Sequence, residues 1–213
     1  AAEPAGSVRV ASFATGIRES VLPLVRRLAR THPDVRLMIH EHEPPEALHR
    51  LAADDVDLAV GYDYNLAPMT LDQTVEVTPL WETKWSLGVP VRDAASSADS
   101  TEVFARFADS DWIVNSRNTA DDDVVRTLAS MAGFTPRIVH RADTLSLVQD
   151  MIAAGLGVGL LPAGLPTTDT VGRCPLTGPD VVLRVFALTR RGRTKWPPLA
   201  TVLRMLVAPT TGS

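Results

Sequence analysis

Several stretches of the 213-residue sequence carry side chains that could hold a metal ion. His40 and His42 would share one face of a strand and could begin a zinc site, but no third ligand is evident beside them. The run Asp121–Asp123 is a poor metal site, because adjacent residues on a helix point in different directions. These acids instead suit the first turn of a helix, where they complement its dipole. We therefore expect no metal site.

Nucleotide-binding and catalytic patterns are equally incomplete. The GLGVG stretch at residues 155–159 follows a helix and enters a strand, whereas a dinucleotide-binding loop does the reverse. Cys174 is the only cysteine, is predicted to lie in a loop, and has no histidine near it in sequence. The chain contains no G-x-S-x-G, H-E-x-x-H or C-x-x-C motif. We expect neither an enzyme nor a cofactor.

Two polar turns remain as candidate ligand sites. Residues 12–15 lie between a strand pattern and a helix pattern, where backbone N–H groups of the helix start point outward and a hydroxyl can add a donor. Ser12 or Thr15 could instead simply cap that helix. Residues 115–119 form the corresponding turn later in the chain, with Asn118 or Thr119 as the expected N-cap. Arg117 and Arg141 could meet a carboxylate ligand, or pair with Asp63 or Asp143.

Alternating strand and helix patterns position these turns. Helical spacing is clear in the first half, although Pro23 predicts a kink or a delayed helix start. In chain order the predicted elements are the strand VRVASF, the helix with Ile17, Val21, Leu24, Val25 and Leu28, the strand in THPDVRLMIH, a helix from Pro44-Pro45, the strand DVDLAVGYDY, a short helix in 99–111, the strand DWIVNS, the helix Asp121–Met131, the strand PRIVHRA, the block 143–162, the strand VVLRVFALTRRG and the helix LATVLRMLV.

The block 143–162 combines a helix, a stop and a strand. Asp143 and Thr144 start the helix, and Gly155 ends it because glycine readily adopts the left-handed conformation. The apolar side chains predicted to share one helix face are Leu145, Leu147, Val148, Met151 and Ile152. Val158, Leu160 and Leu161 follow as a buried strand that Pro162 ends. Ligands in open α/β folds bind at such strand tips.

The patterns predict two α/β lobes that crossing segments join. Lobe one would comprise residues 7–85 with 187–213, and lobe two residues 86–186, with crossings near Lys84–Val89 and Arg184–Thr189. A cleft between hinged lobes is a natural ligand site.

Charge and hydropathy exclude other functions for this stretch of sequence. The formal net charge is −4, and no segment interleaves basic and aromatic residues as a nucleic-acid surface does. The arginines at 26, 27 and 30, and at 190, 191 and 193, are expected to solvate a surface. No apolar run is long enough for a membrane span. Residues 1–7 lack the pattern of a signal peptide and are predicted to end a linker.

Three segments together resemble the effector-binding domain of LysR-type transcriptional regulators: VRVASFATGIRESVLPLVRRLARTHPDVRLMIHE, LHRLAADDVDLAVGY and the block 143–162. The resemblance implies an α/β fold of two Rossmann-like lobes joined by two crossing segments, like type 2 periplasmic binding proteins. It implies a small-molecule effector, such as a carboxylate or an aromatic metabolite, in the cleft between the lobes. The implied effector-binding residues are Ser12, Phe13, Thr15, Gly61, Tyr62, Asn115, Ser116, Arg117, Asp143 and Thr144.

The same resemblance predicts partners and location. The whole protein would be cytoplasmic and would bind promoter DNA through a helix-turn-helix that precedes this fragment. The domain would form a homodimer, or a tetramer, through helix faces and an edge strand, with Ile17–Ala29 and Val124–Met131 as the candidate helices. One alternative is a transporter's solute-binding protein, which predicts an export signal or lipid anchor upstream. An enzyme on the same fold would need a catalytic group that the sequence does not present.

Overall fold

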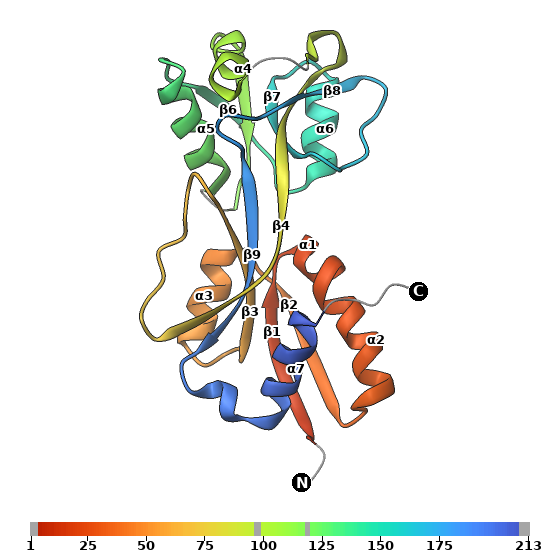
Figure 1. The fold of residues 1–213 in the computed structure, drawn as a ribbon. Coiled ribbons are helices and arrows are strands. Elements are labelled where there is room, and N and C mark those ends of the chain that lie inside the picture. Colours follow the sequence, from red (N-terminus) through yellow and green to blue (C-terminus); the bar gives the residue numbers. More distant parts are fainter. Residues whose placement is uncertain (1–3, 96–98, 118–119, 209–213) are drawn as a thin grey trace. The chain divides into compact units, whose positions relative to one another are not determined.

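Two α/β units make up the chain in the computed structural model, which describes residues 4–95, 99–117 and 120–208 (Figure 1). Unit 1 comprises residues 1–62, 70–81 and 184–213, and unit 2 comprises residues 63–69 and 82–183. The chain therefore passes between the units more than once, and some of its strands contribute residues to both.

Unit 1 is built on a sheet with the strand order β2-β1-β3-β9, in which β1 pairs in parallel with both β2 and β3. In this order the chain moves from β1 to its neighbour β2 on one side, and then from β2 back past β1 to β3 on the other side. Because such connections are right-handed, the helices that follow β1 and β2 lie on opposite faces of the sheet. β3 is buried along its whole length, as expected for a parallel strand covered on both faces. In chain order its elements are β1 (Gly6–Ser12), α1 (Ala14–Gly16), the π-helical turn η1 (Ile17–Val21), α2 (Leu22–Thr31), β2 (Val35–Glu41), α3 (Pro44–Ala52), β3 (Leu58–Tyr64), β9 (Val182–Arg190), the 3-10 turn η3 (Arg193–Lys195) and α7 (Pro197–Val207).

Pro23 shapes the first helix of unit 1 as the sequence predicts. The π-helical turn Ile17–Val21 immediately precedes α2, in which the proline occupies one of the first two positions. At a helix start the missing proline N–H removes no hydrogen bond that the helix needs. The wider turn before it is a recognised way for a helix to absorb such an interruption.

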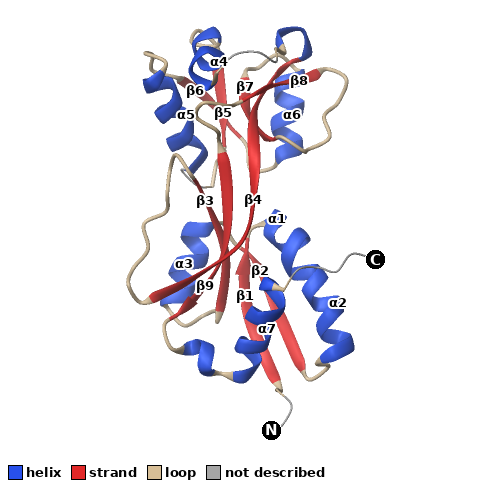
Figure 2. Ribbon diagram, viewed as in Figure 1, coloured by secondary structure: helices blue, strands red, loops and turns tan. Residues whose placement is uncertain are grey.

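Unit 2 has a mixed sheet (Figure 2). β5 pairs in parallel with β6 and β7, while β4 runs antiparallel to β7 and β8. Its elements are β4 (Val75–Pro90), the 3-10 turn η2 (Val91–Asp93), α4 (Ser100–Arg106), β5 (Asp111–Val114), α5 (Ala120–Met131), β6 (Arg137–Arg141), α6 (Leu145–Ala153), β7 (Val158–Pro162) and β8 (Val171–Pro175). The first residues of β4 belong to unit 1.

The connection from α6 to β7 follows the sequence prediction closely. α6 ends at Ala153, and Gly155 adopts a φ of 76°, the left-handed conformation that glycine favours. Val148 and Ile152 pack with Ile113 and Leu161 in the core of this unit. The prediction that Leu147 shares the buried apolar face of this helix is wrong, because 47% of its surface is exposed.

The predicted loop around Cys174 is also wrong. Cys174 lies in β8, is fully buried, and pairs with Leu87 of β4. The glycine and prolines around it suggested a loop, but a long-range antiparallel partner organises them into a strand.

Candidate functional site

The turn after β1 is more buried than the sequence suggested. Ser12 has 0% exposed surface, and its hydroxyl donates to the Phe13 carbonyl at 3.1 Å. Phe13 is the N-cap of α1, and no side chain caps this helix, so the interpretation of Ser12 or Thr15 as a capping residue is wrong. Thr15 is half-buried, and its hydroxyl makes no hydrogen bond within the described part of the chain.

Aromatic residues close this end of the unit 1 sheet. The rings of Phe13 and Tyr62 meet edge to face with centroids 4.7 Å apart, and the Tyr62 hydroxyl donates to a Glu43 carboxylate oxygen at 3.0 Å. Gly61 is buried in β3, where an added Cβ would lie 3.3 Å from Leu188. Unit 1 therefore brings Ser12, Phe13, Gly61 and Tyr62 to one sheet end. The role of Glu43 was not predicted from sequence.

The turn after β5 carries the first candidate residues of unit 2. Asn115 Oδ1 accepts the Arg117 backbone N–H at 2.7 Å, an arrangement that holds the turn with a side chain. Ser116 and Arg117 are exposed. The predicted N-caps Asn118 and Thr119 lie outside the described residues. The acids at 121–123 stand in the first turn of α5, as predicted.

A second polar turn lies beside the first. Val114 pairs with Arg141 in the β5–β6 register, and the Ala142 N–H donates to the Val114 carbonyl at 3.0 Å. Asp143 and Thr144 follow directly, and both are exposed. Thr144 caps α6, since its Oγ1 accepts the Leu147 N–H at 3.3 Å. The candidate residues of unit 2 therefore gather at one end of its sheet.

Arg141 already has an anionic partner at this end of unit 2. Its guanidinium lies 2.8 Å from the carboxylate of Asp122, which also pairs with Arg126. The interpretation that Arg141 pairs with Asp63 or Asp143 is therefore wrong. The sequence predicts a helix-dipole role for all three acids at 121–123, and the ion pair with Arg141 is a further role of Asp122 that only the fold reveals. The Tyr64 hydroxyl also donates to Asp121 at 2.9 Å, a bond between residues too far apart in the sequence for local patterns to predict.

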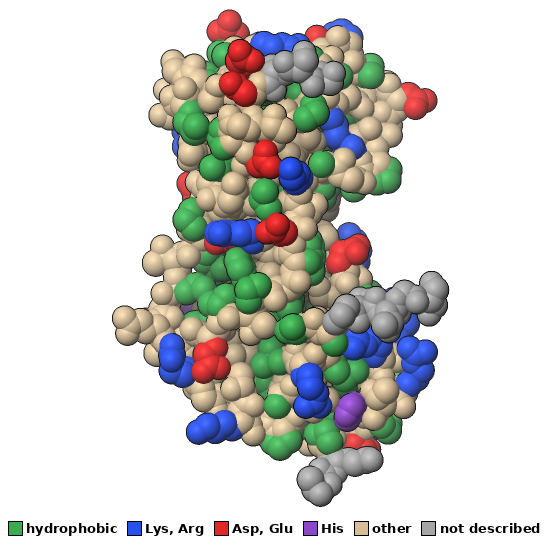
Figure 3. Space-filling model, viewed as in Figure 1, with side chains coloured by type: hydrophobic (Ala, Val, Ile, Leu, Met, Phe, Trp, Pro, Cys, Tyr) green, Lys and Arg blue, Asp and Glu red, His purple; other side chains and the backbone are tan. Residues whose placement is uncertain are grey.

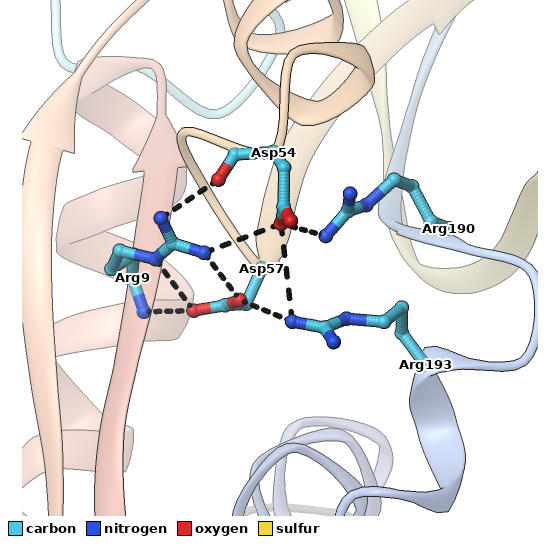
Figure 4. A network of polar contacts seen from close by, with 5 residues as sticks. All are labelled: Arg9, Asp54, Asp57, Arg190 and Arg193. Carbon is cyan, nitrogen blue, oxygen red and sulfur yellow. Dashed lines mark hydrogen bonds and ion pairs between the residues drawn. The ribbon is translucent and has the colours of Figure 1, made fainter.

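A charged network ties together distant parts of unit 1 (Figure 4). Asp57 accepts from Arg9 through both carboxylate oxygens, at 2.9–3.0 Å, and from Arg193 at 3.3 Å. Asp54 pairs with Arg9, Arg190 and Arg193. The prediction that Arg190 and Arg193 solvate a surface is wrong, because both bind these carboxylates.

The network holds its acids ionised. Burial alone would raise the pKa of Asp57, but the hydrogen bonds from Arg9 outweigh it and lower the pKa below its usual value. The hydrogen bond from Arg190 likewise lowers the pKa of Asp54. In return, the Asp57 carboxylate raises the pKa of Arg9. This network is a structural feature of the end of the unit 1 sheet opposite the candidate turns, since Asp57 precedes β3 and Ser12 ends β1.

Metal and membrane sites find no support among the described residues. His42 Nδ1 lies 3.0 Å from a Glu46 carboxylate oxygen, and no described group of three histidine, cysteine, aspartate or glutamate residues could hold a metal ion. None of the helices described in residues 4–95, 99–117 and 120–208 is long and apolar enough to cross a membrane. Figure 3 shows acidic and basic side chains intermingled over the visible face.

Comparison with known proteins identifies relatives over nearly the whole chain. Residues 1–209 match the family model described as LysR substrate binding domain. The chain is 26% identical over 157 residues to the HTH-type transcriptional regulator CysB of Haemophilus influenzae, a match that covers 73% of this chain and 47% of that protein. The chain thus spans about half the length of this curated relative.

Two solved structures show the same fold. The C-terminal domain of a probable LysR family regulator from Rhodococcus sp. RHA1 superposes with a TM-score of 0.78, at 17% identity over 96% of this chain and 100% of that one. The effector-binding domain of QuiR in complex with shikimate superposes with a TM-score of 0.77, at 14% identity over 95% of this chain and 96% of that one. The predicted α/β fold class, that of the type 2 periplasmic binding proteins, is confirmed.

Proposed function

The chain belongs to the LysR substrate-binding domain family, and from this premise we propose that it is the ligand-sensing regulatory domain of a LysR-type transcriptional regulator. Family membership over residues 1–209 is the observation that carries the proposal. It favours a sensor over the solute-binding protein of a transporter. The CysB relative is named as a helix-turn-helix regulator, which supports DNA binding by the whole protein.

The proposed effector site is formed by the polar turns at the strand ends. In this proposal lobe I comprises residues 7–85 with 187–213 and lobe II comprises residues 86–186; the two compact units divide the chain slightly differently, with residues 63–69 and 82–85 in unit 2 and residues 184–186 in unit 1. The proposed effector-binding residues are Ser12, Phe13, Thr15, Gly61, Tyr62, Asn115, Ser116, Arg117, Asp143 and Thr144. The uncommitted Thr15 hydroxyl and the exposed Ser116 support this assignment, because each can still bond a ligand. Ser12 would first have to leave its bond to the Phe13 carbonyl.

A small carboxylate or aromatic metabolite is the proposed effector class. The shikimate bound to QuiR belongs to this class, which supports the assignment. The domain carries out no catalysis and needs no cofactor. Effector binding shifts the equilibrium between two conformations by the difference in affinity for them, and that shift controls DNA binding by the cytoplasmic regulator.

Homodimerisation is proposed to use edge strands and neighbouring helices. β2 and β6 each end a run of paired strands, and each exposes an apolar side chain, Met38 and Val139. The candidate helices expose further apolar side chains, Leu22 and Val25 on α2 and Met131 on α5. Exposed apolar surface on an unpaired strand favours association. Sedimentation at micromolar concentration should show a dimer or tetramer, and a purely monomeric chain would contradict the assignment.

The regulatory role is tested with the whole gene product. The complete protein should protect a site upstream of the genes it controls in a nuclease footprint, and a cognate carboxylate should change the protected region. A whole protein that binds no DNA specifically, or whose footprint no such ligand changes, would refute the proposed function.

Threonine variants test the effector site. A panel of small carboxylates that includes shikimate is screened by calorimetry, and Thr15→Val should weaken binding of any ligand found by about tenfold, since one lost hydrogen bond costs about 1–1.5 kcal/mol. Thr135→Val changes an exposed threonine outside the turns and should bind normally. Thr144→Val should also weaken binding, but it removes the α6 cap and lowers stability as well, so Thr144→Ser is its control. Normal binding by both valine variants would contradict the site.

A further inference from the structure

An open pocket in unit 1 lies at the end of the sheet opposite the turn after β1. Its volume is about 690 Å³, and Gln73, Thr74, Arg190 and Arg191 line it. Gln73 and Thr74 precede β4, while Arg190 ends β9 and Arg191 follows it. We propose that this pocket binds a small oxyanion of the phosphate or sulfate type, either free or as an ester. The inference goes beyond the proposed function and does not depend on it.

Two hydrogen bonds from Arg191, one from its backbone and one from its side chain, hold the two sides of the pocket together. The Arg191 N–H donates to the Thr74 carbonyl at 2.7 Å, and Arg191 Nε donates to the Gln73 carbonyl at 3.0 Å. The Asp72 carboxylate accepts the Thr74 N–H at 2.7 Å, which shapes the turn before β4. The lining residues are therefore positioned before any ligand arrives, which reduces the entropy lost on binding.

Arg191 supplies an uncommitted cation. Beyond its bond to Gln73, its guanidinium makes no hydrogen bond or ion pair in residues 4–95, 99–117 and 120–208. Arginine carries its remaining N–H donors in a planar fork, which matches two oxygens of an oxyanion. The outer N–H groups of Arg191 are thus available to a ligand.

Arg190 adds positive charge that its partner does not fully balance. Its guanidinium binds Asp54, but Asp54 is shared with Arg9 and Arg193. The buried Nε of Arg190 has no hydrogen-bond partner among the described residues. A buried donor without a partner leaves the cation less well stabilised and strengthens its pull on a nearby anion.

The charges around the pocket balance, so hydrogen-bond donors aimed at the ligand, rather than a net positive charge, would hold an anion there. The network of Figure 4 contains three arginines and two aspartates, so one positive charge is left over, and Arg191 adds a second. Asp72 and Glu76 offset these two charges, because each stays a carboxylate while it accepts a hydrogen bond, from the Thr74 N–H at 2.7 Å and from the Thr194 hydroxyl at 3.5 Å. The guanidinium groups of Arg190 and Arg191 and the Gln73 amide form a donor set suited to an oxyanion, whereas the Thr74 hydroxyl is bonded to Asp72. The volume exceeds that of a free phosphate ion and leaves room for the organic part of an ester.

Titration of the isotope-labelled 213-residue chain with inorganic phosphate tests the site, with sodium chloride added to keep the ionic strength constant. Saturable amide shifts are expected at Gln73, Thr74 and Arg191 in the NMR spectrum. Arg191→Gln should weaken binding at least about tenfold, the loss expected when a charged two-point contact is removed. Its melting temperature without phosphate should stay within about 2 °C of the wild type, because Arg191 is exposed and its backbone N–H keeps its bond to the Thr74 carbonyl. A parallel titration with glycerol 3-phosphate distinguishes an ester from the free ion by which binds more tightly.

Arg92→Gln is the matched control. Arg92 is 79% exposed in unit 2 and lies 3.7 Å from Asp93, so its loss should leave phosphate binding unchanged. Shifts that do not saturate, equal binding by Arg191→Gln and wild type, or equal weakening by Arg92→Gln would each overturn the proposal. Shifts confined to residues 12–16 or 115–117 would also overturn it, since they would place the anion in the proposed effector site. The DNA footprint is a separate readout, so either proposal can fail without the other.

Discussion

Asp57→Asn should lower the stability of the folded chain substantially. The Asp57 side chain is only 3% exposed, and its carboxylate accepts the backbone N–H, Nε and Nη2 of Arg9 as well as Nη2 of Arg193. Asparagine keeps the shape of the side chain but loses its negative charge. Its NH2 group would then face arginine N–H groups that are themselves hydrogen-bond donors. One of the two oxygen positions therefore changes from attraction to repulsion.

The size of the effect follows from the exposure of the two partners. Removing one member of a buried ion pair costs about 3–5 kcal/mol, because the other charge stays buried. Arg9 is 38% exposed and can regain water, and the asparagine oxygen still accepts, so we expect a loss of about 2–3 kcal/mol. At about 2–4 °C per kcal/mol for a chain of this size, the melting temperature should fall by about 5–10 °C.

Urea unfolding and calorimetry at neutral pH measure this loss. The control is Asp55→Asn, an adjacent acid that is 56% exposed and lies 3.8 Å from Arg50. The control should change the free energy of unfolding by less than about 0.5 kcal/mol. A variant at Asp57 that melts within about 1 °C of the wild type, or no lower than the Asp55 variant, would refute the reasoning.

Acid titration of the same variant checks the cause. The pKa of Asp57 is lower in the folded chain than its ordinary value, so the carboxylate stabilises the fold fully above the unfolded pKa of about 3.9. That contribution is lost as the pH falls through the folded pKa. The stability gap between wild type and Asp57→Asn should therefore be constant above about pH 5 and narrow below about pH 4. A gap that is independent of pH down to acid unfolding would show that packing, not charge, causes the loss.

The remaining predictions concern the core and a backbone contact of unit 2. Ile152→Ala should lower the free energy of unfolding, measured with urea, by about 2–5 kcal/mol, because Ile152 is fully buried in the core cluster. Leu147→Ala, at an exposed position of the same helix, should lower it by less than about 0.5 kcal/mol. Equal effects of the two substitutions would contradict the assigned buried face of α6. Gly157→Ala should destabilise more than Gly155→Ala, since its Cβ would lie 2.4 Å from the Asp111 carbonyl oxygen whereas nothing lies within 4 Å at Gly155. The latter should cost about 1 kcal/mol from its left-handed backbone, and a reversed order by differential scanning calorimetry would disprove the steric argument.

Local patterns in the sequence predicted most helices and strands correctly. The stop of α6 at Gly155, the irregular turn before Pro23 and the acidic first turn of α5 each depend on residues within one or two turns of each other. Such features arise from backbone conformation and dipole effects that neighbouring residues alone determine. The polar turns were located correctly for the same reason, since they lie between recognisable strands and helices.

Only the tertiary structure decided which side chains meet. Arg9 and Asp57 come together because β1 and β3 are neighbours in the sheet, and β8 exists because β4 offers it a partner. Sequence periodicity carries information about the buried face of an element but none about strand order or register. The commitment of Arg141 to Asp122, and the burial of Ser12, followed from that register and from packing, and so could be known only once the elements were in place.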